Sequence, residues 1–570
     1  MTNNIRVFLW LSLLLALWLN YSQWQIDYGA KAATSASATD ITGAPKPADI
    51  NDSVPQVAQT AATGTTPTDA VPTASTPETA AVPSAVESTG ARKIRVTTDV
   101  LALDISLTGG TLVRAELPGY PIVKGEAAPV VLFNTDQAST NYVLRTGLSN
   151  PKGADAPTHQ ATFAAAADSY TLAPGQTELR VPLTWTDGQG ITVTKTFVFR
   201  RGQFIIDLEY EIDNASQAPW SAASYARIQR LDPPVERSMF KVESYATRGP
   251  VIYDGTKYRK LDIESKEDTT LAIDVTNGWI GGMQHHFVSA VVPNHETPQK
   301  VTLAVTGREY FLTTVSATAE TVAPGTKKTL KEGLFVGPKL QAQLETMHPE
   351  LSRVADYGAL TLLSKPLFWL LDHAHSIVKN WGLAIILVTF LLKLLFYPLS
   401  EKAGRSMARM RALAPRMKAL QETYKDDRTK LGQATMELYK TEKVNPLAGC
   451  LPMLIQMPVF LAFYWVLLES VEMRQAPFFG WINDLSARDP FFILPVLNGL
   501  AMWGQSKLNP PPPDPVQARI FQLMPIVFSV MFALFPAGLV LYWVTNTGLS
   551  ILQQWNINRK ITAEDKARKK

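Results

Sequence analysis

The feature that most constrains this chain is a run of 39 residues without a charged side chain, from Ile520 to Asn558. About 20 apolar residues are enough for one helix to cross the hydrocarbon layer of a bilayer, which is roughly 30 Å thick. The run therefore has the length of two spans. The tripeptide Pro536-Ala537-Gly538 interrupts it and predicts a tight turn between them. This pattern argues for a polytopic membrane protein and against a plain soluble enzyme.

Further apolar runs lie in the last third of the chain. They extend from Trp381 to Leu399, from Leu447 to Leu468 and from Pro490 to Gln505, and the only charge among them is Lys393. A fourth run lies near the N-terminus, from Ile5 to Trp24. Together these segments predict six transmembrane helices.

The N-terminal run admits two interpretations. Its dense core, Val7 to Leu19, has the length of the apolar region of a signal peptide, and small residues that could form a cleavage site follow at 30–32 and 36–38. These small residues lie far beyond the end of the core, which favours an uncleaved anchor over residues 1–25. No cysteine follows the core, so a lipoprotein is excluded.

Basic residues predict the orientation of the spans. Residues 400–444 carry eleven Lys and Arg against six Asp and Glu, and the tail 559–570 carries six against two. Segments rich in Lys and Arg stay in the cytoplasm. Because six spans return the chain to its starting side, both termini are predicted to be cytoplasmic, and residues from about 25 to 380 and the loop 472–489 lie outside.

The exported region divides into a tether and a folded domain. Residues 26–92 consist mostly of Ala, Thr, Ser and Pro, a composition typical of a flexible tether. Within residues 93–350, apolar side chains alternate with polar ones, for example from Phe204 to Ile212, and Gly and Asp separate the alternating runs. This periodicity predicts a large antiparallel β-sandwich. Residues 364–380 then predict an amphipathic helix on the outer membrane surface, capped by Ser364.

Few residues point to chemistry in the exported domain. The single cysteine, Cys450, excludes disulfide frameworks and zinc fingers. His285 and His286 are adjacent and would face opposite sides of a strand, so they cannot readily bind one metal ion. His295-Glu296 lacks the second histidine of a zinc protease helix. A binding or docking domain is therefore favoured over an enzyme.

Residues 400–444 predict a helical hairpin in the cytoplasm. Apolar side chains, among them Met407, Met410 and Met417, recur there every three or four residues. Methionine adapts its shape to varied apolar partners, which suits a surface that receives different proteins. The same stripes could equally pack against each other, and the spacing does not decide between these roles.

Lys393 is the most informative single residue, because it lies about 9 Å from the cytoplasmic end of its predicted span, at 1.5 Å per residue. An ammonium at that depth must be hydrated or paired. One interpretation is that its side chain reaches the headgroups. The other is that Lys393 faces a wet groove and attracts acidic groups of a visiting molecule.

Five stretches carry a resemblance to a known family: Phe390–Leu399 (FLLKLLFYPL), Lys443–Pro458 (KVNPLAGCLPMLIQMP), Arg474–Phe478 (RQAPF), Asp484–Pro490 (DLSARDP) and Phe535–Tyr542 (FPAGLVLY). They resemble motifs of the YidC/Oxa/Alb family of membrane protein insertases. The resemblance is dense over residues 364–560. The anchor, tether and exported domain match the layout of its Gram-negative form, in which the first span is retained.

The resemblance implies an ATP-independent insertase, without covalent chemistry or a cofactor, that inserts and helps fold integral membrane proteins. Five core helices within residues 381–558 would surround a hydrophilic groove open to the cytoplasm and to lipid. The implied groove residues are Lys393, Thr389 and Gln456, and the implied apolar slide is Met457, Phe460, Met531 and Trp543. Many relatives carry arginine in place of Lys393, and some carry tyrosine and phenylalanine in place of Trp543 and Met531.

The resemblance also implies partners and a location. Nascent membrane proteins would be the substrates, alone or with the Sec translocon and its accessory proteins. The ribosome would bind the cytoplasmic loop and the basic tail 559–570, where Lys and Arg can contact phosphates. The protein would reside in the lipid bilayer of the inner membrane.

Two other classes of protein fit parts of the pattern. One is a transporter for an acidic solute with Lys393 as its binding cation, but the sequence shows no repeated halves and no paired intramembrane acids. The other is an exported sugar-binding or enzymatic sandwich on an anchor, but five well-patterned spans exceed what anchoring requires. No P-loop is present, which argues against an ATP-driven pump.

Overall fold

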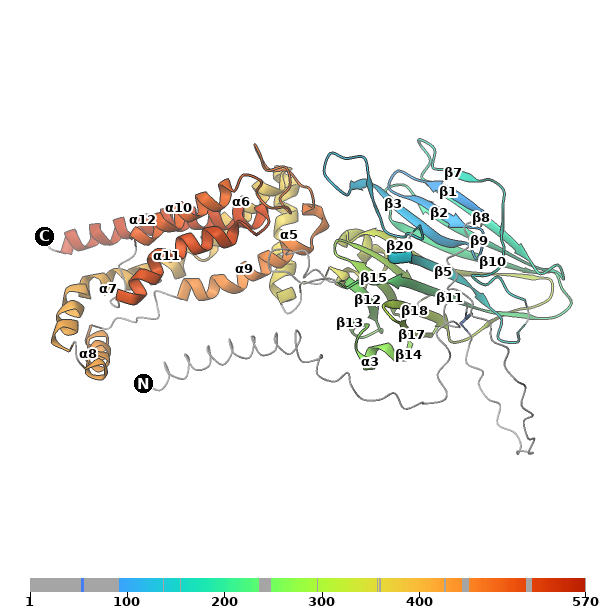
Figure 1. Ribbon diagram of the computed structural model, residues 1–570, viewed down its shortest axis with the longest axis horizontal. Coiled ribbons are helices and arrows are strands. Elements are labelled where there is room, and N and C mark those ends of the chain that lie inside the picture. Colours follow the sequence, from blue (N-terminus) through green and yellow to red (C-terminus); the bar gives the residue numbers. More distant parts are fainter. Residues whose placement is uncertain are drawn as a thin grey trace, which may run out of the picture. The chain divides into compact units, whose positions relative to one another are not determined.

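The computed structural model describes residues 53–55, 92–136, 138–153, 155–234, 248–294, 296–355, 357, 360–424, 427–442, 451–508 and 515–568. The predicted anchor, nearly all of the tether, His295 and Cys450 lie outside these ranges. Residues 54–570 belong to one compact unit. Figure 1 shows its strands in the first part of the chain and its long helices, α5 to α12, in the last part.

The first sheet has eleven strands. Its main path, in spatial order, is β14 (Ala272–Val275), β17 (Gln299–Thr306), β18 (Glu309–Ser316), β11 (Trp220–Leu231), β5 (Tyr142–Ser149), β3 (Thr111–Pro121), β2 (Ala102–Ser106), β1 (Lys93–Thr97) and β7 (Ser169–Thr171). Two short strands extend it, β4 (Pro129–Val131) on β3 and β19 (Glu320–Val322) on β11.

The second sheet has nine strands. Their spatial order is β13 (Tyr258–Lys260), β12 (Arg248–Tyr253), β15 (Trp279–Gln284), β16 (Phe287–Val292), β20 (Thr326–Pro338), β10 (Ile205–Asn214), β9 (Ile191–Arg200), β8 (Glu178–Thr186) and β6 (Ala164–Ala165). Short helical turns connect or follow the strands: η1 (Ala138–Thr140), α3 (Lys266–Thr269), α4 (Gln341–Met347) and η3 (Pro349–Val354).

One hydrophobic core joins the two sheets. On β10 the alternating side chains Ile206, Leu208, Tyr210 and Ile212 are all fully buried, and they pack in the same cluster as side chains of β2, β3 and β11 from the other sheet. This arrangement agrees with the predicted antiparallel sandwich, because period-two patterns place every second side chain on the buried face. Among the paired strands of the described residues, β1 and β7 alone run parallel.

The prediction that His285 and His286 lie in a strand was wrong. They form the turn between β15 and β16, where His285 has a φ of 44°. Their rings stack with centroids 3.7 Å apart instead of facing opposite sides of a sheet. The physical reason is that a tight turn reverses the chain between them, which a period-two argument does not anticipate.

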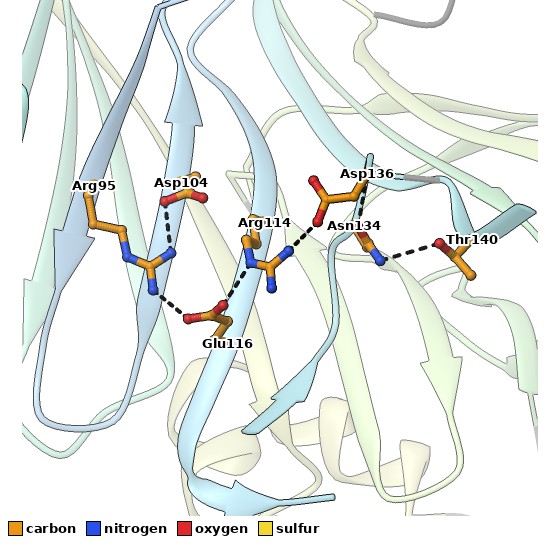
Figure 2. A network of polar contacts seen from close by, with 7 residues as sticks. All are labelled: Arg95, Asp104, Arg114, Glu116, Asn134, Asp136 and Thr140. Carbon is orange, nitrogen blue, oxygen red and sulfur yellow. Dashed lines mark hydrogen bonds and ion pairs between the residues drawn. The ribbon is translucent and has the colours of Figure 1, made fainter. Parts of the chain in front are cut away.

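A chain of ion pairs crosses the outer face of β1, β2 and β3, as Figure 2 shows. Arg95 Nη1 donates to Asp104 Oδ1 at 2.8 Å, and Arg95 also contacts Glu116. Arg114 Nε donates to Glu116 Oε1 at 2.7 Å and pairs on its other side with Asp136. Partial burial raises the pKa of Glu116, but hydrogen bonds from Arg114 and Arg95 outweigh it and lower the pKa overall.

Replacing Glu116 with glutamine is expected to destabilise the sandwich by less than about 1 kcal/mol at neutral pH, because partly exposed ion pairs contribute little. A lowered folded-state pKa means that the stabilisation is present above the ordinary value of 4.5 and is lost as the pH falls below it. Thermal melting of the full-length protein in detergent, followed in the β-sheet band of circular dichroism, should therefore separate Glu116→Gln from wild type at pH 7 and not at pH 3. An equal difference at both pH values would contradict this assignment.

The last part of the chain is helical. Its helices are α5 (Thr361–Val378), α6 (Trp381–Leu395), α7 (Tyr397–Thr423), α8 (Arg428–Thr441), α9 (Leu451–Glu469), α10 (Ile493–Leu508), α11 (Pro515–Phe532) and α12 (Ala537–Arg568), with the short turn η6 (Val471–Met473) after α9. The break between α11 and α12 includes Pro536, as the sequence predicts. The helix α12 continues through most of the predicted tail.

The amphipathic helix is present but begins earlier than predicted. Helix α5 begins at Thr361, so Ser364 lies inside it and is not the cap. The Ser364 side chain is buried and its hydroxyl donates to the Ala462 carbonyl of α9 at 3.3 Å. The face formed by Leu367, Leu371 and Ala374 is buried, as the periodicity predicts.

Within the described residues, no single helix combines the length and hydropathy needed to cross a membrane. The pair Trp381–Leu395 and Tyr397–Ser406 meets both requirements together, with a bend of 60° between its halves. The bend falls at Phe396, before Pro398. The predicted span Trp381 to Leu399 therefore does not run straight, and the count of six spans stays a prediction.

Candidate functional site

Two adjoining cavities meet at Lys393. The smaller, of about 50 Å³, is lined by residues of α6, α7, α9 and α12: Thr389, Leu392, Lys393, Phe396, Leu399, Ser400, Gln456, Val459, Tyr542 and Asn546. The larger, of about 290 Å³, shares four of these residues and extends along α12, with Ala403, Gly404, Met457, Phe460, Met502, Gln505, Trp543, Thr547, Ser550, Gln553, Gln554 and Ile557. We call the two cavities together the groove.

Lys393 lies in the last turn of α6 and is half-buried. Its Nζ donates to Ser550 Oγ at 2.8 Å, and Ser550 in turn donates to the Asn546 carbonyl at 2.7 Å. Among the residues that the structure describes, no carboxylate forms an ion pair with this ammonium. Lys393 thus has a neutral hydrogen-bond partner and keeps donor capacity for a further group.

The other two predicted groove residues also line the groove. Thr389 is buried, and its hydroxyl donates to the Ile385 carbonyl of its own helix at 2.6 Å. Gln456 lines both cavities and interacts with the Tyr542 hydroxyl. The structure therefore brings Lys393, Thr389 and Gln456 together from α6 and α9.

Three of the four predicted slide residues lie on one wall of the groove. Met457 is 44% exposed, and the rings of Phe460 and Trp543 meet edge to face with centroids 4.7 Å apart. Met531 on α11 is 36% exposed and lines neither cavity, although its neighbour Phe532 contacts the Trp543 ring. Polar and apolar side chains of α9 and α12 thus line the same groove.

Packing of the start of α12 against the helical core supports the groove. The Phe463 and Tyr542 rings stack with centroids 4.5 Å apart, and Leu539 and Val540 are fully buried in the helical core. The start of α12 is bonded to the loop before α10, since Gly538 N donates to the Leu485 carbonyl at 2.8 Å. A Cβ on Gly538 would lie 3.1 Å from that carbonyl oxygen, so glycine permits this close approach.

The predicted hairpin is present as α7 and α8. Asp427 caps α8 by accepting hydrogen bonds from the amides of Thr429 and Lys430. Met407 lies in α7, Met410 is half-buried and Met417 is 8% exposed. Part of the methionine stripe of α7 is therefore buried by packing, as in the alternative to a role in binding other proteins. The first turns of α7, at Ala403 and Gly404, form the end of the larger cavity.

Three groove residues, Ser550, Gln553 and Ile557, were missed by the sequence analysis. With Asn546, a polar residue that the sequence already places near Lys393, they recur every three or four residues along one face of α12 and line the larger cavity. A spacing of three or four residues places side chains on one face of a helix, so this face of α12 could have been identified from the sequence. Two other polar residues near the spans, Gln522 and Ser529, line a separate cavity of about 540 Å³ between α10 and α11 instead.

The groove supplies one cation, neutral hydrogen-bonding groups and an apolar wall. The described residues contain no group of three or more side chains that could hold a metal ion. The arrangement can hold an acidic or polar segment beside Lys393 while an apolar segment lies against Met457, Phe460 and Trp543.

Comparisons with known proteins cover nearly the whole chain. The family described as 60Kd inner membrane protein matches residues 373–565, and the family described as YidC periplasmic domain matches residues 93–370. The membrane protein insertase YidC of Thioalkalivibrio sulfidiphilus is 45% identical over 580 residues and 100% of both chains. That of Methylococcus capsulatus is 44% identical over 544 residues and 95% of both chains. A crystal structure of an active YidC insertase has 18% identity and a TM-score of 0.36, covering 81% of this chain and 92% of that one.

Proposed function

The chain belongs to the YidC family of membrane protein insertases, and from this premise we propose that it inserts integral membrane proteins into the inner membrane through the groove around Lys393. The observation that carries the proposal is that a half-buried cation, held by a neutral hydroxyl, lies in the same groove as the apolar side chains of Met457, Phe460 and Trp543, of which Met457 is exposed. An inserting segment needs both surfaces at once.

The mechanism is thermodynamic and involves no covalent step. The short outer segment of a client enters the groove, where Lys393 and the polar stripe of α12 replace part of its hydration. This lowers the cost of moving polar backbone into the membrane. The apolar segment of the client lies against Phe460 and Trp543 and then moves into lipid, where its burial drives release. Acidic outer segments gain most, since Lys393 has no carboxylate partner within the described residues.

The proposal includes the predicted topology. Residues 1–25 form an anchor, 26–92 a tether and 93–350 a periplasmic domain, followed by the interfacial helix 364–380, the insertase core 381–558 and the tail 559–570. Both termini lie in the cytoplasm. The hairpin 400–444 receives clients, and the Sec translocon and the ribosome are the proposed partners. The bent helix pair α6 and α7 then connects the core to the hairpin.

The experiment is insertion of a small single-span protein with an acidic outer segment into vesicles whose lipids allow little spontaneous insertion. Protease protection measures the inserted fraction. Vesicles with the purified full-length protein should insert several times more client than empty vesicles, without ATP. If they do no better than empty vesicles, the insertase proposal fails for this client. Uptake of radiolabelled aspartate by the same vesicles would then favour the transporter.

A further inference from the structure

A turn of the first sheet presents two neighbouring apolar side chains. The turn joins β3 to β4, and its residues Ile122 and Val123 are 57% and 51% exposed. Its own backbone closes it, because the Ile122 amide donates to the Ala128 carbonyl at 2.9 Å. The Glu126 amide donates to the Val123 carbonyl at 3.1 Å. We call residues 121–128 the tip. Internal hydrogen bonds lower the cost of moving such a turn out of water.

The tip is bonded to the loop that connects η6 with α10. Lys124 Nζ donates to the Gln475 carbonyl at 2.7 Å and also contacts the Asn483 carbonyl. In the other direction, Arg474 Nη2 donates to the Pro121 carbonyl at 2.7 Å, and Gln475 Nε2 donates to the same carbonyl at 3.0 Å. Donors from both segments therefore hold the tip against this loop, and these bonds do not involve the two apolar side chains.

The same loop is bonded to the starts of two helices. Asn380, which caps α6, donates from Nδ2 to the Phe478 carbonyl at 3.4 Å. The Gly538 amide of α12 donates to the Leu485 carbonyl at 2.8 Å. In the proposed topology the starts of α6 and α12 are the outer ends of two spans. On that topology the tip lies beside the outer boundary of the hydrocarbon layer.

Other exposed apolar side chains lie at this end of the helices. Phe479 of the loop is 58% exposed, and Phe491 and Phe492, just before α10, are 67% and 50% exposed. Such side chains are typical of surfaces that enter the boundary between headgroups and acyl chains. The tip continues this apolar rim, which argues for lipid as its partner. Its charges agree with this position, since Lys124 is bonded to carbonyls and the exposed Glu126 can stay solvated among the headgroups.

We propose that Ile122 and Val123 insert into the outer leaflet of the membrane, so that lipid is the partner of this part of the sandwich. The inference rests on the topology included in the proposed function and adds a second attachment to it, besides the covalent connection through α5. Because the tip is also bonded to the loop at the start of α6, insertion fixes the sandwich at one end of the helix that carries Lys393 in its last turn.

The test measures the depth of the tip in the full-length protein, reconstituted in phosphatidylcholine nanodiscs. A nitroxide label is attached to Val123→Cys after the single cysteine is removed by Cys450→Ser. The matched control is Gln189→Cys in the exposed turn between β8 and β9. Electron paramagnetic resonance reports collisions with oxygen, which concentrates in the membrane, and with a water-soluble nickel complex.

We expect collisions with the nickel complex to be about threefold fewer at position 123 than at position 189, and collisions with oxygen to be more frequent. Because insertion depends on apolar side chains, the result should be the same in nanodiscs that also contain phosphatidylglycerol. A second measurement leaves the chain unchanged. Wild-type protein is reconstituted with a phosphatidylcholine that carries a diazirine on its acyl chain, and mass spectrometry should find lipid adducts within residues 121–128 after illumination.

Equal access of the nickel complex to positions 123 and 189, or no adducts within residues 121–128, would mean that the tip lies in water and would overturn the proposal. Few collisions with either reagent at position 123 would mean that protein covers the tip, either a second copy or another segment of this chain, and would also overturn it. So would protection that appears only with phosphatidylglycerol, since the attachment would then be electrostatic.

No client takes part in these measurements. A tip in water beside normal client insertion therefore rejects this membrane contact and leaves the insertase proposal standing. A tip in lipid beside absent client insertion rejects the insertase proposal for that client and leaves the contact.

Discussion

Replacing Lys393 with alanine is expected to reduce insertion of a client with an acidic outer segment by about tenfold, and Lys393→Arg is expected to retain most of it. Two opposite charges 4 Å apart attract by about 4 kcal/mol at an effective dielectric of 20. Part of this is offset by lost hydration, and the remaining 1 to 2 kcal/mol corresponds to roughly tenfold. Arginine keeps the charge and adds a planar fork for carboxylates.

The control for this prediction uses both the protein and the client. Lys507→Ala removes the same charge from an exposed lysine that stacks on Trp503 and does not line the groove. It should insert like wild type. A client whose acidic residues are changed to Asn and Gln should lose little in Lys393→Ala. If that variant inserts the acidic client as well as wild type does, Lys393 only extends to the headgroups and the groove does not work through charge.

Local sequence pattern predicts where several groove residues lie. Lys393 was identifiable because a charge in an apolar run is rare, and the strands were identifiable because their apolar residues alternate. The residues Ser550, Gln553 and Ile557 continue from Asn546 at helical spacing, yet they lie in a run without charges, where neutral polar residues are harder to recognise as a site. Local pattern therefore predicts which face a residue occupies.

What the sequence could not supply is contact between distant segments. Strand β16 pairs with β20 only from Gly333 to Pro338, because β16 ends at Val292, and only the register of the two strands reveals this. The start of α5 was misplaced because Ser364 bonds to Ala462, which is 98 residues away, instead of capping its own helix. Tertiary contacts overrode local preference in both cases.

A buried ion pair between Lys339 and Glu469 also joins distant segments, and breaking it is expected to have the largest effect on the free energy of unfolding. Lys339 follows β20 and Glu469 ends α9, and their side chains form an ion pair with Nζ and Oε2 2.7 Å apart. The two side chains are 0% and 1% exposed. Neighbouring contacts continue the junction: Arg474 donates to the Pro121 carbonyl at 2.7 Å. The pair therefore links the end of β20 in the sandwich to the last residue of α9.

Removing either partner alone is expected to destabilise the protein by about 3 to 5 kcal/mol, because the other charge stays buried without compensation. Replacing both with methionine should recover most of that loss, since two apolar side chains of similar length leave no buried charge. The measurement is the rate at which protease cleaves the connection between Lys339 and α5 in the purified full-length protein, together with thermal unfolding. Both single variants should be cleaved much faster than wild type.

The comparison variant is Lys327→Met, which breaks an ion pair whose lysine is 62% exposed. It should change the free energy of unfolding little, because water screens an exposed pair and solvates the carboxylate that remains. A double variant no more stable than the single ones would mean that packing at the junction, and not the uncompensated charge, accounts for the loss. Single variants as stable as Lys327→Met would mean that water reaches the pair and that the junction opens in solution.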